Sequence, residues 1–399
     1  MSASRAGLRM FLAASVLTGA TACHQAQAKH AAPDLKIVGI TQIGLNGSPE
    51  QAAPNAVPAD PADGGTAHCA AVSIAVMAPL TGADAALGAN IKDGAQLAVD
   101  QHNAANPACV VQLKALDTGG DPQKAAAVAQ QVVDDASTIG VIGPGNSGEV
   151  KATGPIFEQA GIVAATPSAT NGDLSHNNWR TFIRGLANDD VQGPSVARYL
   201  TNTLGARKVC VVDDSTDYGL GLAKAVAGGL GPAAAGGCTV EVKRGDKDFS
   251  AAVTQIKNAQ PDAIFYGGYY TEAAILVHQL RDAGVAATFA SGDASNDPEF
   301  VKQAGAAAKD ALLSCPCAPA SGAFADQYQK SFGQQAGTYS AEGYDLATIM
   351  VKGVDAGQVT RPALLGYLHR YRGQGVARTY QWKPDGELTN TLIWMYKVQ

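Results

Sequence analysis

The amino-acid sequence predicts an α/β protein made of two similar lobes, each with a parallel β-sheet. From residue 72 onward, short apolar runs alternate with segments of helical spacing, which is the pattern of βαβ units. The same series occurs twice, and cysteines stand in matching places in both copies. A chain of 399 residues is long enough for two complete hydrophobic cores.

The predicted elements follow this series in order. In the first copy the strands are 72–80, 110–117, 139–142 and 162–165, and the helices are 84–103, 122–136 and 149–160. In the second copy the strands are 208–213, 239–243, 263–267, 287–291 and 311–315, and the helices are 219–230, 249–258, 272–283 and 298–304. After these come predicted helices at 324–332, 341–354 and 362–371 and strands at 380–382 and 392–398.

The stretch 139–170 carries the strongest sign of a binding site. Two buried strands in it each end in small hydroxyl residues, which include Ser147 after the first strand and Ser168 and Thr170 after the second. The carboxyl ends of parallel strands share one edge of a sheet, and ligands bind at that edge. A helix that starts there has unpaired N–H groups that favour an anion such as a carboxylate.

The same stretch contains the spacing GxGxxG at Gly143, Gly145 and Gly148, which is typical of dinucleotide binding. We reject that interpretation because the strand in front of it is the third of its unit rather than the first. No acidic residue ends the next strand to bind a ribose. The sequence therefore predicts no nucleotide and no other cofactor.

Residues 1–23 have the pattern of a targeting signal. Arg5 and Arg9 precede a short apolar run, and small residues stand directly before Cys23. This resembles a bacterial lipobox, so Cys23 is expected to carry a lipid; a plain signal peptide is the alternative. Residues 24–66 are predicted to be a flexible linker, within which 35–43 is apolar enough to form a small strand.

Charge and cysteine content exclude other classes. The formal net charge is −6 and no cluster of Lys and Arg is present, which argues against nucleic acid as a partner. No cysteine and histidine motif has the spacing of a zinc site, so no metal is predicted.

The six cysteines after Cys23 are expected to form disulfides, because an exported protein meets an oxidising compartment. Two pairs stand at the starts of strands that should be neighbours, and a third pair is close in the chain. The predicted bonds are Cys69–Cys109, Cys210–Cys238 and Cys315–Cys317. Six cysteines allow about fifteen connectivities, so this pairing is a hypothesis.

Nine segments resemble one known family in order and spacing. They are APLTGADAALGANIKDGAQLAVD, DTGGDPQKAAAVAQQVV, IGVIGPGNSG, TPSAT, GLANDDVQGP, VVDDSTDYGLGLA, KDFSAAVTQIK, YGGYYTEA and FASGD. The family is that of the solute-binding proteins of branched-chain amino acid ABC transporters, with the type I periplasmic fold. The resemblance covers residues 72–398.

This resemblance implies two doubly wound lobes joined by three chain crossings, which close on a ligand like a hinge. Lobe one would comprise 67–187 and 318–378. Lobe two would comprise 188–317 and 379–399.

The resemblance also implies a site for an amino acid zwitterion. Ser147, Ser168 and Thr170 would bind the carboxylate, and Asp293 would accept from the ammonium where the family usually has Glu. Tyr218 and Tyr269 would close over the ligand. Leu87 and Tyr339 would line the side-chain pocket, which Leu87 and Gly145 are expected to widen.

The implied function is that of a monomeric binding protein rather than an enzyme. It would capture an amino acid outside the cell, pass it to an ABC-transporter permease, and be tethered to the outer face of the membrane. A ligand-sensing receptor is the alternative, and leucine, isoleucine and valine, other apolar amino acids, amides and urea all stay open as ligands. An exported hydrolase is disfavoured, because GNSGE around Ser147 is not GxSxG.

Overall fold

The computed structural model of the chain describes residues 35–50, 57–63 and 68–399. The predicted targeting segment 1–23 and its lipidation site Cys23 lie outside these residues. Within the described part, no helix is both long enough and apolar enough to pass through a bilayer. Two β-sheets with helices packed on them organise the described chain.

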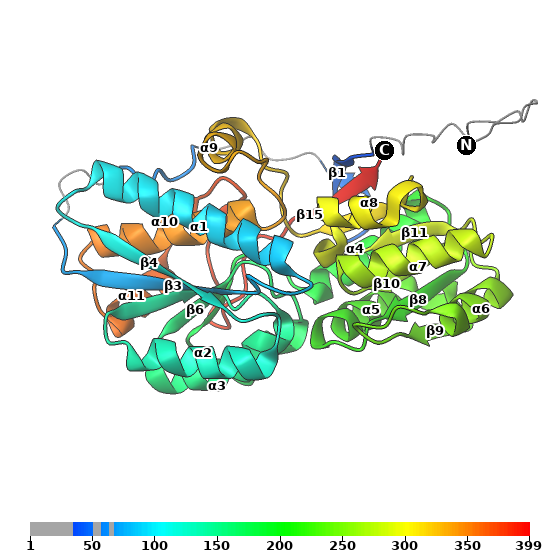
Figure 1. Ribbon diagram of the computed structural model, residues 1–399, viewed down its shortest axis with the longest axis horizontal. Coiled ribbons are helices and arrows are strands. Elements are labelled where there is room, and N and C mark those ends of the chain that lie inside the picture. The colour runs from blue at the N-terminus through cyan, green and yellow to red at the C-terminus, as the bar shows by residue number, and fades with distance from the viewer. Residues whose placement is uncertain (1–34, 51–56, 64–67) are drawn as a thin grey trace, which may run out of the picture. The chain divides into compact units, whose positions relative to one another are not determined.

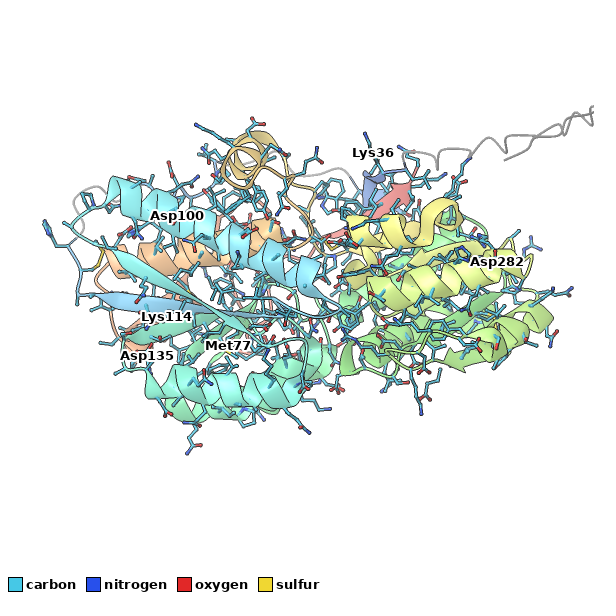
Figure 2. All side chains as sticks on the ribbon, in the orientation of Figure 1. Lys36, Met77, Asp100, Lys114, Asp135 and Asp282 are labelled. Carbon is cyan, nitrogen blue, oxygen red and sulfur yellow. A yellow bond between two sulfur atoms is a disulfide. The ribbon has the colours of Figure 1, made fainter. Side chains whose placement is uncertain are left out.

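The first sheet has five parallel strands in the order β4-β3-β5-β6-β7. They are β3 (Val72–Ala78), β4 (Val111–Asp117), β5 (Thr138–Ile142), β6 (Val163–Thr166) and β7 (Phe182–Arg184). Every residue of β3 is buried, including Met77 in the interior of the layer (Figure 2). A parallel strand that is covered on both faces reads in this way as one continuous apolar run.

Helices cover both faces of this sheet. They are α1 (Ala85–Ala105), α2 (Pro122–Asp134), α3 (Ser147–Ala160), α10 (Ser340–Asp355) and α11 (Arg361–Arg370). Helix α1 packs on α10 and helix α2 packs on α3, and Figure 1 shows these two pairs on opposite sides of the strands. The start of α2 is set by Asp121, whose side chain accepts hydrogen bonds from the N–H groups of Gln123 and Lys124.

The second sheet has eight strands in the order β2-β1-β15-β12-β11-β10-β8-β9. Five are mutually parallel: β8 (Val209–Asp213), β9 (Ala234–Glu241), β10 (Ala263–Gly267), β11 (Thr288–Ser291) and β12 (Leu312–Cys315). Three more add antiparallel to one edge: β15 (Ile393–Val398), β1 (Ile37–Ile43) and β2 (Pro49–Glu50). The associated helices are α4 (Asp189–Arg198), α5 (Asp217–Leu230), α6 (Ser250–Ala259), α7 (Tyr270–Asp282) and α8 (Pro298–Ala304).

The parallel strands of the two sheets follow the same topology. Numbered in chain order within each sheet, their spatial order is 2-1-3-4-5 in both cases. This is the doubly wound arrangement, in which the strand order reverses beside the first strand and opens a crevice at the carboxyl ends. The predicted fold class, two parallel-sheet α/β lobes, is confirmed. The residue boundaries of the two lobes stay a prediction.

The small strand expected at 35–43, within the predicted linker 24–66, is present as β1. Strand β1 pairs with β15 along its length, from Ile37 opposite Val398 to Ile43 opposite Ile393. After it, the Leu45 carbonyl accepts a hydrogen bond from Arg198. The free edge of β15 supplies backbone partners for these residues, and linker composition says nothing about that edge.

Helix α4 was not predicted from the sequence; it continues into a π-helical turn at Tyr199–Thr203. Gly193 and Pro194 lie inside α4, and both residues usually interrupt a helix. A Cβ on Gly193 would lie 2.5 Å from the Cβ of Ala225, so the glycine allows α4 to approach α5 closely. Tertiary packing thus outweighs the local signal.

All three predicted disulfides are present. They join Cys69 to Cys109, Cys210 to Cys238 and Cys315 to Cys317, with Cα–Cα distances of 4.7, 4.9 and 4.9 Å. The first two bonds lie beside the strand pairs β3–β4 and β8–β9, which are neighbours as expected.

The remaining elements are short, apart from helix α9 (Gly322–Phe332). The strand predicted at 380–382 begins one residue earlier, as β14 (Thr379–Tyr380), and pairs with β13 (Gly373–Gln374). Turns of 3₁₀ helix stand at Gly172–Asn177, Gly231–Ala233, Asp293–Ser295 and Gly305–Ala308.

Candidate ligand-binding site

Loops that follow strands of both sheets line one pocket. The lining residues are Pro79, Leu87, Ile91, Gly145, Asn146, Ser147, Ser168, Tyr218, Tyr269, Asp293, Ala294 and Tyr339. Seven of the eight residues that the sequence analysis assigns to the ligand are among them, and Thr170 is not. The pocket therefore lies at the carboxyl ends of the parallel strands, where doubly wound folds bind ligands.

Ser147 stands at the first position of α3, directly after the glycine-rich turn that follows β5. Its Oγ accepts a hydrogen bond of 3.2 Å from the backbone N–H of Asn171. A serine hydroxyl also has one proton to donate. Because the first N–H groups of a helix lack intrahelical acceptors, Ser147 and the start of α3 together can bind an anion.

Ser168 has a more structural role. Its hydroxyl donates to the carbonyl oxygen of Gly145 at 2.6 Å and so ties the loop after β6 to the turn after β5. The hydroxyl proton is used within the protein, which leaves acceptor lone pairs and backbone groups for a ligand.

Asp293 forms the acidic side of the pocket and is fully buried. Its Oδ1 accepts hydrogen bonds of 2.9 Å from the Tyr218 hydroxyl and from Nε2 of Gln192, and its Oδ2 accepts one of 2.5 Å from the Tyr339 hydroxyl. Burial raises the pKa of Asp293, and the bonds from Tyr339 and Gln192 oppose that rise. Asp293 does not cap α8, because Asp297 does so by accepting from the N–H of Glu299.

Two tyrosines form an aromatic wall beside Asp293. The rings of Tyr218 and Tyr269 lie 5.3 Å apart at an angle of 60°, and both side chains are buried. Tyr269 also lies under the guanidinium of Arg244, at 4.1 Å from the ring centroid. This cation–π interaction helps to hold the Tyr269 ring in its position.

Arg244 also pairs with an acid that follows a strand of the five-stranded sheet. Its Nη2 donates to Oδ2 of Asp84, which accepts a second hydrogen bond of 2.9 Å from Nδ2 of Asn146. Asp84 precedes α1, and Arg244 follows β9. Because Asn146 and Tyr269 line the pocket, this ion pair joins its two sides.

The apolar end of the pocket is formed by Leu87 and Ile91 of α1 with Pro79. The expectation that Gly145 widens this end is wrong. A Cβ on Gly145 would lie 2.9 Å from Cδ of Pro79, so the proline fills the space that a side chain would take.

The whole parallel-sheet region matches a family model described as periplasmic binding protein, over residues 71–399. The chain belongs to the periplasmic binding protein family. It is 36% identical over 235 residues to a Leu/Ile/Val-binding protein of Rhizobium johnstonii. The matched segment covers 57% of this chain and 63% of the relative, so the chain spans less than two thirds of the relative's length.

Solved structures agree with this membership. The leucine-binding protein LivK of Thermotoga maritima matches with a TM-score of 0.74 and 27% identity, over 81% of this chain and 94% of that one. The branched-chain amino acid transporter substrate-binding protein LivJ of Streptococcus pneumoniae, solved with isoleucine, has a TM-score of 0.74 and 27% identity, over 82% and 95% of the two chains.

Thr170 is not among the residues that line the pocket of this periplasmic binding protein. The residue is fully buried, and its carbonyl oxygen accepts a hydrogen bond of 2.8 Å from the N–H of Asp189.

Several residues of the site were not predicted from the sequence, above all Gln192, Asn146 and the Asp84–Arg244 pair. Gln192 lies in GLANDDVQGP, one of the nine family segments, but that segment contains no strand end to suggest a role. Its bond to Asp293 joins residues 101 positions apart.

The described structure contains one group of residues with the geometry of a possible metal site: His102, Cys109 and Asp355. The sulfur of Cys109 is bonded to Cys69, and Nε2 of His102 lies 2.8 Å from Oδ1 of Asp355. The residues therefore do not fit a metal while the disulfide is intact.

Proposed function

We propose that this periplasmic binding protein captures an apolar α-amino acid outside the cytoplasm and delivers it to the permease of an ABC transporter. One observation carries the proposal: a single pocket holds a buried carboxylate, Asp293, and a serine at a helix N-terminus, Ser147. A zwitterion needs an acceptor for its ammonium and donors for its carboxylate, and these residues provide both.

The apolar wall supports a hydrocarbon side chain in the ligand. Leu87, Ile91 and Pro79 offer no hydrogen bond to a polar side chain. Leucine, isoleucine and valine are the first candidates, because the relatives named above bind branched-chain amino acids.

Binding would involve both parts of the protein. Ser147 follows a strand of the five-stranded sheet, whereas Tyr218, Tyr269 and Asp293 follow strands of the eight-stranded sheet. The ligand would meet the serine side first, and the tyrosines and the acid would then close over it. The contact from Tyr339 to Asp293 and the Asp84–Arg244 pair support a closed state of this kind.

The proposed role is binding without catalysis. The Ser147 hydroxyl accepts a hydrogen bond from the backbone N–H of Asn171, and no histidine among the described residues hydrogen-bonds to it. We also propose that the mature protein is a monomer. A lipid on Cys23 would tether it to the membrane, as the first 23 residues suggest. Cys23→Ser should then release the protein from the membrane fraction.

The test is a thermal-shift panel on ligand-free protein with the common amino acids, amides and urea. A ligand that binds only the folded state increases the free energy of unfolding and so raises the melting temperature. At a hundredfold excess over its dissociation constant, the gain in unfolding free energy is about 2.7 kcal/mol. Leucine, isoleucine or valine is expected to give the largest shift. No shift with any amino acid would refute the proposed function.

Asp293→Ala is the sharpest variant for this test. It leaves the ligand's ammonium buried without its partner, at a cost of roughly 3–5 kcal/mol, so binding should fall below detection. Asp282→Ala is the matched control, because Asp282 is exposed at the end of α7 (Figure 2). If Asp293→Ala binds leucine normally, the site assignment is wrong.

A further inference from the structure

The disulfide between Cys315 and Cys317 is a pair of sulfurs that the proposed function does not use. It spans two positions of the chain, whereas the other two disulfides span 40 and 28 positions. A disulfide stabilises a protein mainly by closing a loop in the unfolded chain, and the effect grows with the length of that loop. This bond therefore constrains the unfolded chain least of the three, and any specific role of it lies in the folded protein.

The bond lies in a connection between the two sheets. Cys315 is the last residue of β12, and the chain runs through Cys317 to α9, which packs on α1 beside the five-stranded sheet. The Pro316 carbonyl oxygen accepts a hydrogen bond of 2.6 Å from Nη2 of Arg378, which belongs to a second connection, from α11 back to β15. The Cys317 carbonyl oxygen accepts one of 2.9 Å from the Tyr396 hydroxyl. Closure around a ligand bends such connections, so the disulfide lies where the hinge must move.

Contacts lead from the disulfide to the ligand pocket. Nδ2 of Asn296 lies 3.9 Å from Sγ of Cys317, and the Asn296 carbonyl oxygen accepts a hydrogen bond from the Thr338 hydroxyl. The next residue, Tyr339, donates to Oδ2 of Asp293 in the pocket. The position of one sulfur is thus linked, through Asn296 and two adjacent residues, to the acid proposed to bind the ligand's ammonium.

A cavity gives small molecules a route to one of the two sulfurs. Its volume is about 480 Å³, and its lining includes Cys317, Asn296, Thr338 and Tyr396 but not Cys315. Cys315 is 0% exposed and Cys317 is 1% exposed, so a reagent in this cavity meets Cys317 first. Which sulfur is attacked decides the course of thiol–disulfide exchange.

We propose that Cys315–Cys317 is a thiol-exchange site, at which a small thiol or dithiol reduces the bond and thereby weakens ligand binding. The inference rests on the proposed function and adds a regulation of the same pocket. A reductant thiolate attacks Sγ of Cys317, the S–S bond breaks, and Cys315 leaves as a thiolate that takes up a proton. A second thiolate of the reductant then displaces Cys317, which also takes up a proton. The reductant becomes a disulfide, and two electrons pass to the protein.

Reduction changes the connection from a closed ring to an open chain. The two cysteines can then separate, so the connection gains conformations that closure on the ligand must remove. Leucine should therefore bind the reduced protein about tenfold more weakly, as for the ordering of one residue's backbone. Because coupling between two sites is reciprocal, bound leucine must oppose reduction by the same factor. A tenfold change in this two-electron equilibrium is about 30 mV.

The first experiment measures both sides of this coupling on wild-type protein. The protein is equilibrated in mixtures of reduced and oxidised dithiothreitol, with and without saturating leucine, and free thiols are trapped and assigned by peptide mass spectrometry. Leucine is expected to shift the Cys315–Cys317 equilibrium about tenfold toward the disulfide, and to leave the Cys210–Cys238 equilibrium unchanged. Calorimetric titration of the oxidised and the reduced protein with leucine should give the same factor.

Two double variants separate this role from a purely structural one. Cys315→Ser with Cys317→Ser removes the bond, and Cys210→Ser with Cys238→Ser is the matched control, because that bond lies beside two strands of a single sheet. The first should bind leucine about tenfold more weakly, with little change in the melting temperature of the ligand-free protein. The control should melt at a lower temperature, because it opens a loop of 28 positions, and bind leucine within twofold of the wild type.

The outcomes separate the two proposals. Equal leucine affinity of the oxidised and the reduced wild-type protein, or a Cys315–Cys317 equilibrium that leucine does not shift, overturns this inference and leaves the proposed function standing. If the variant without this bond does not fold, the equilibrium of the wild-type protein decides alone. Wild-type protein that binds no amino acid overturns both.

Discussion

Replacing Arg244 with methionine tests whether the ligand is held by a specific ion pair between the two parts of the protein. Asp84 is only 2% exposed, and 24% of the Arg244 side chain is exposed. In Arg244→Met the Asp84 carboxylate keeps the hydrogen bond from Asn146 but loses its counter-ion. The stacking on Tyr269 loses its charge as well, although methionine retains contact with the ring.

The magnitude follows from this burial. Removing one partner of a buried ion pair costs roughly 3–5 kcal/mol. Because the arginine is partly exposed, solvent screening reduces the expected cost to about 2 kcal/mol. If the pair forms only when the two parts close on the ligand, the whole cost appears in binding, and the dissociation constant should rise about 30-fold.

The assay is calorimetric titration with leucine on Arg244→Met, on Asp84→Asn and on the double variant. Coupled residues should show a double variant that costs less than the sum of the singles. Lys302→Met is the control, because it removes a cation from an exposed pair with Glu299. An affinity of Arg244→Met within twofold of the wild type, or strictly additive costs, would show that closure does not depend on this pair.

Three further predictions concern stability. Burial raises the pKa of Glu149 to about 7, so the folded protein binds more protons than the unfolded chain and this group lowers stability as pH rises from about 4.5 to 7. Glu149→Gln should therefore stabilise the protein by up to roughly 3 kcal/mol at pH 8 and have little effect at pH 4. Urea unfolding at the two pH values measures this, and an equal change in unfolding free energy at pH 8 and pH 4 would contradict it. Gly94→Ala should destabilise the contact of α1 with α10, because its Cβ would lie 2.0 Å from the Ser340 carbonyl oxygen, whereas Gly228→Ala meets nothing within 4 Å and should be neutral or stabilising in the same melts. Deleting residues 35–50 should lower the melting temperature by exposing the edge of β15, and an unchanged value would mean that β1 contributes no stability.

The sequence by itself determined the architecture and the general position of the site. Alternating apolar runs and helical segments are local signals, and burial of a parallel strand on both faces makes each run continuous. The disulfides Cys69–Cys109 and Cys210–Cys238 followed for the same reason, because strands adjacent in a sheet carry their cysteines to one edge. Ser147 was predicted because it stands just after a predicted strand, where parallel sheets bind ligands, whereas Asp293 was expected from the family resemblance.

Only the tertiary structure decided how those residues are connected. The bonds from Gln192 and Tyr339 to Asp293 join residues 101 and 46 positions apart, and no periodicity encodes such pairs. The docking of β1 depends on the free edge of the last strand, which exists only once the second sheet has formed. Asp189 is unremarkable in the sequence beside Asp190, and burial alone distinguishes the two, because the energy of a carboxylate depends on its access to water and partners.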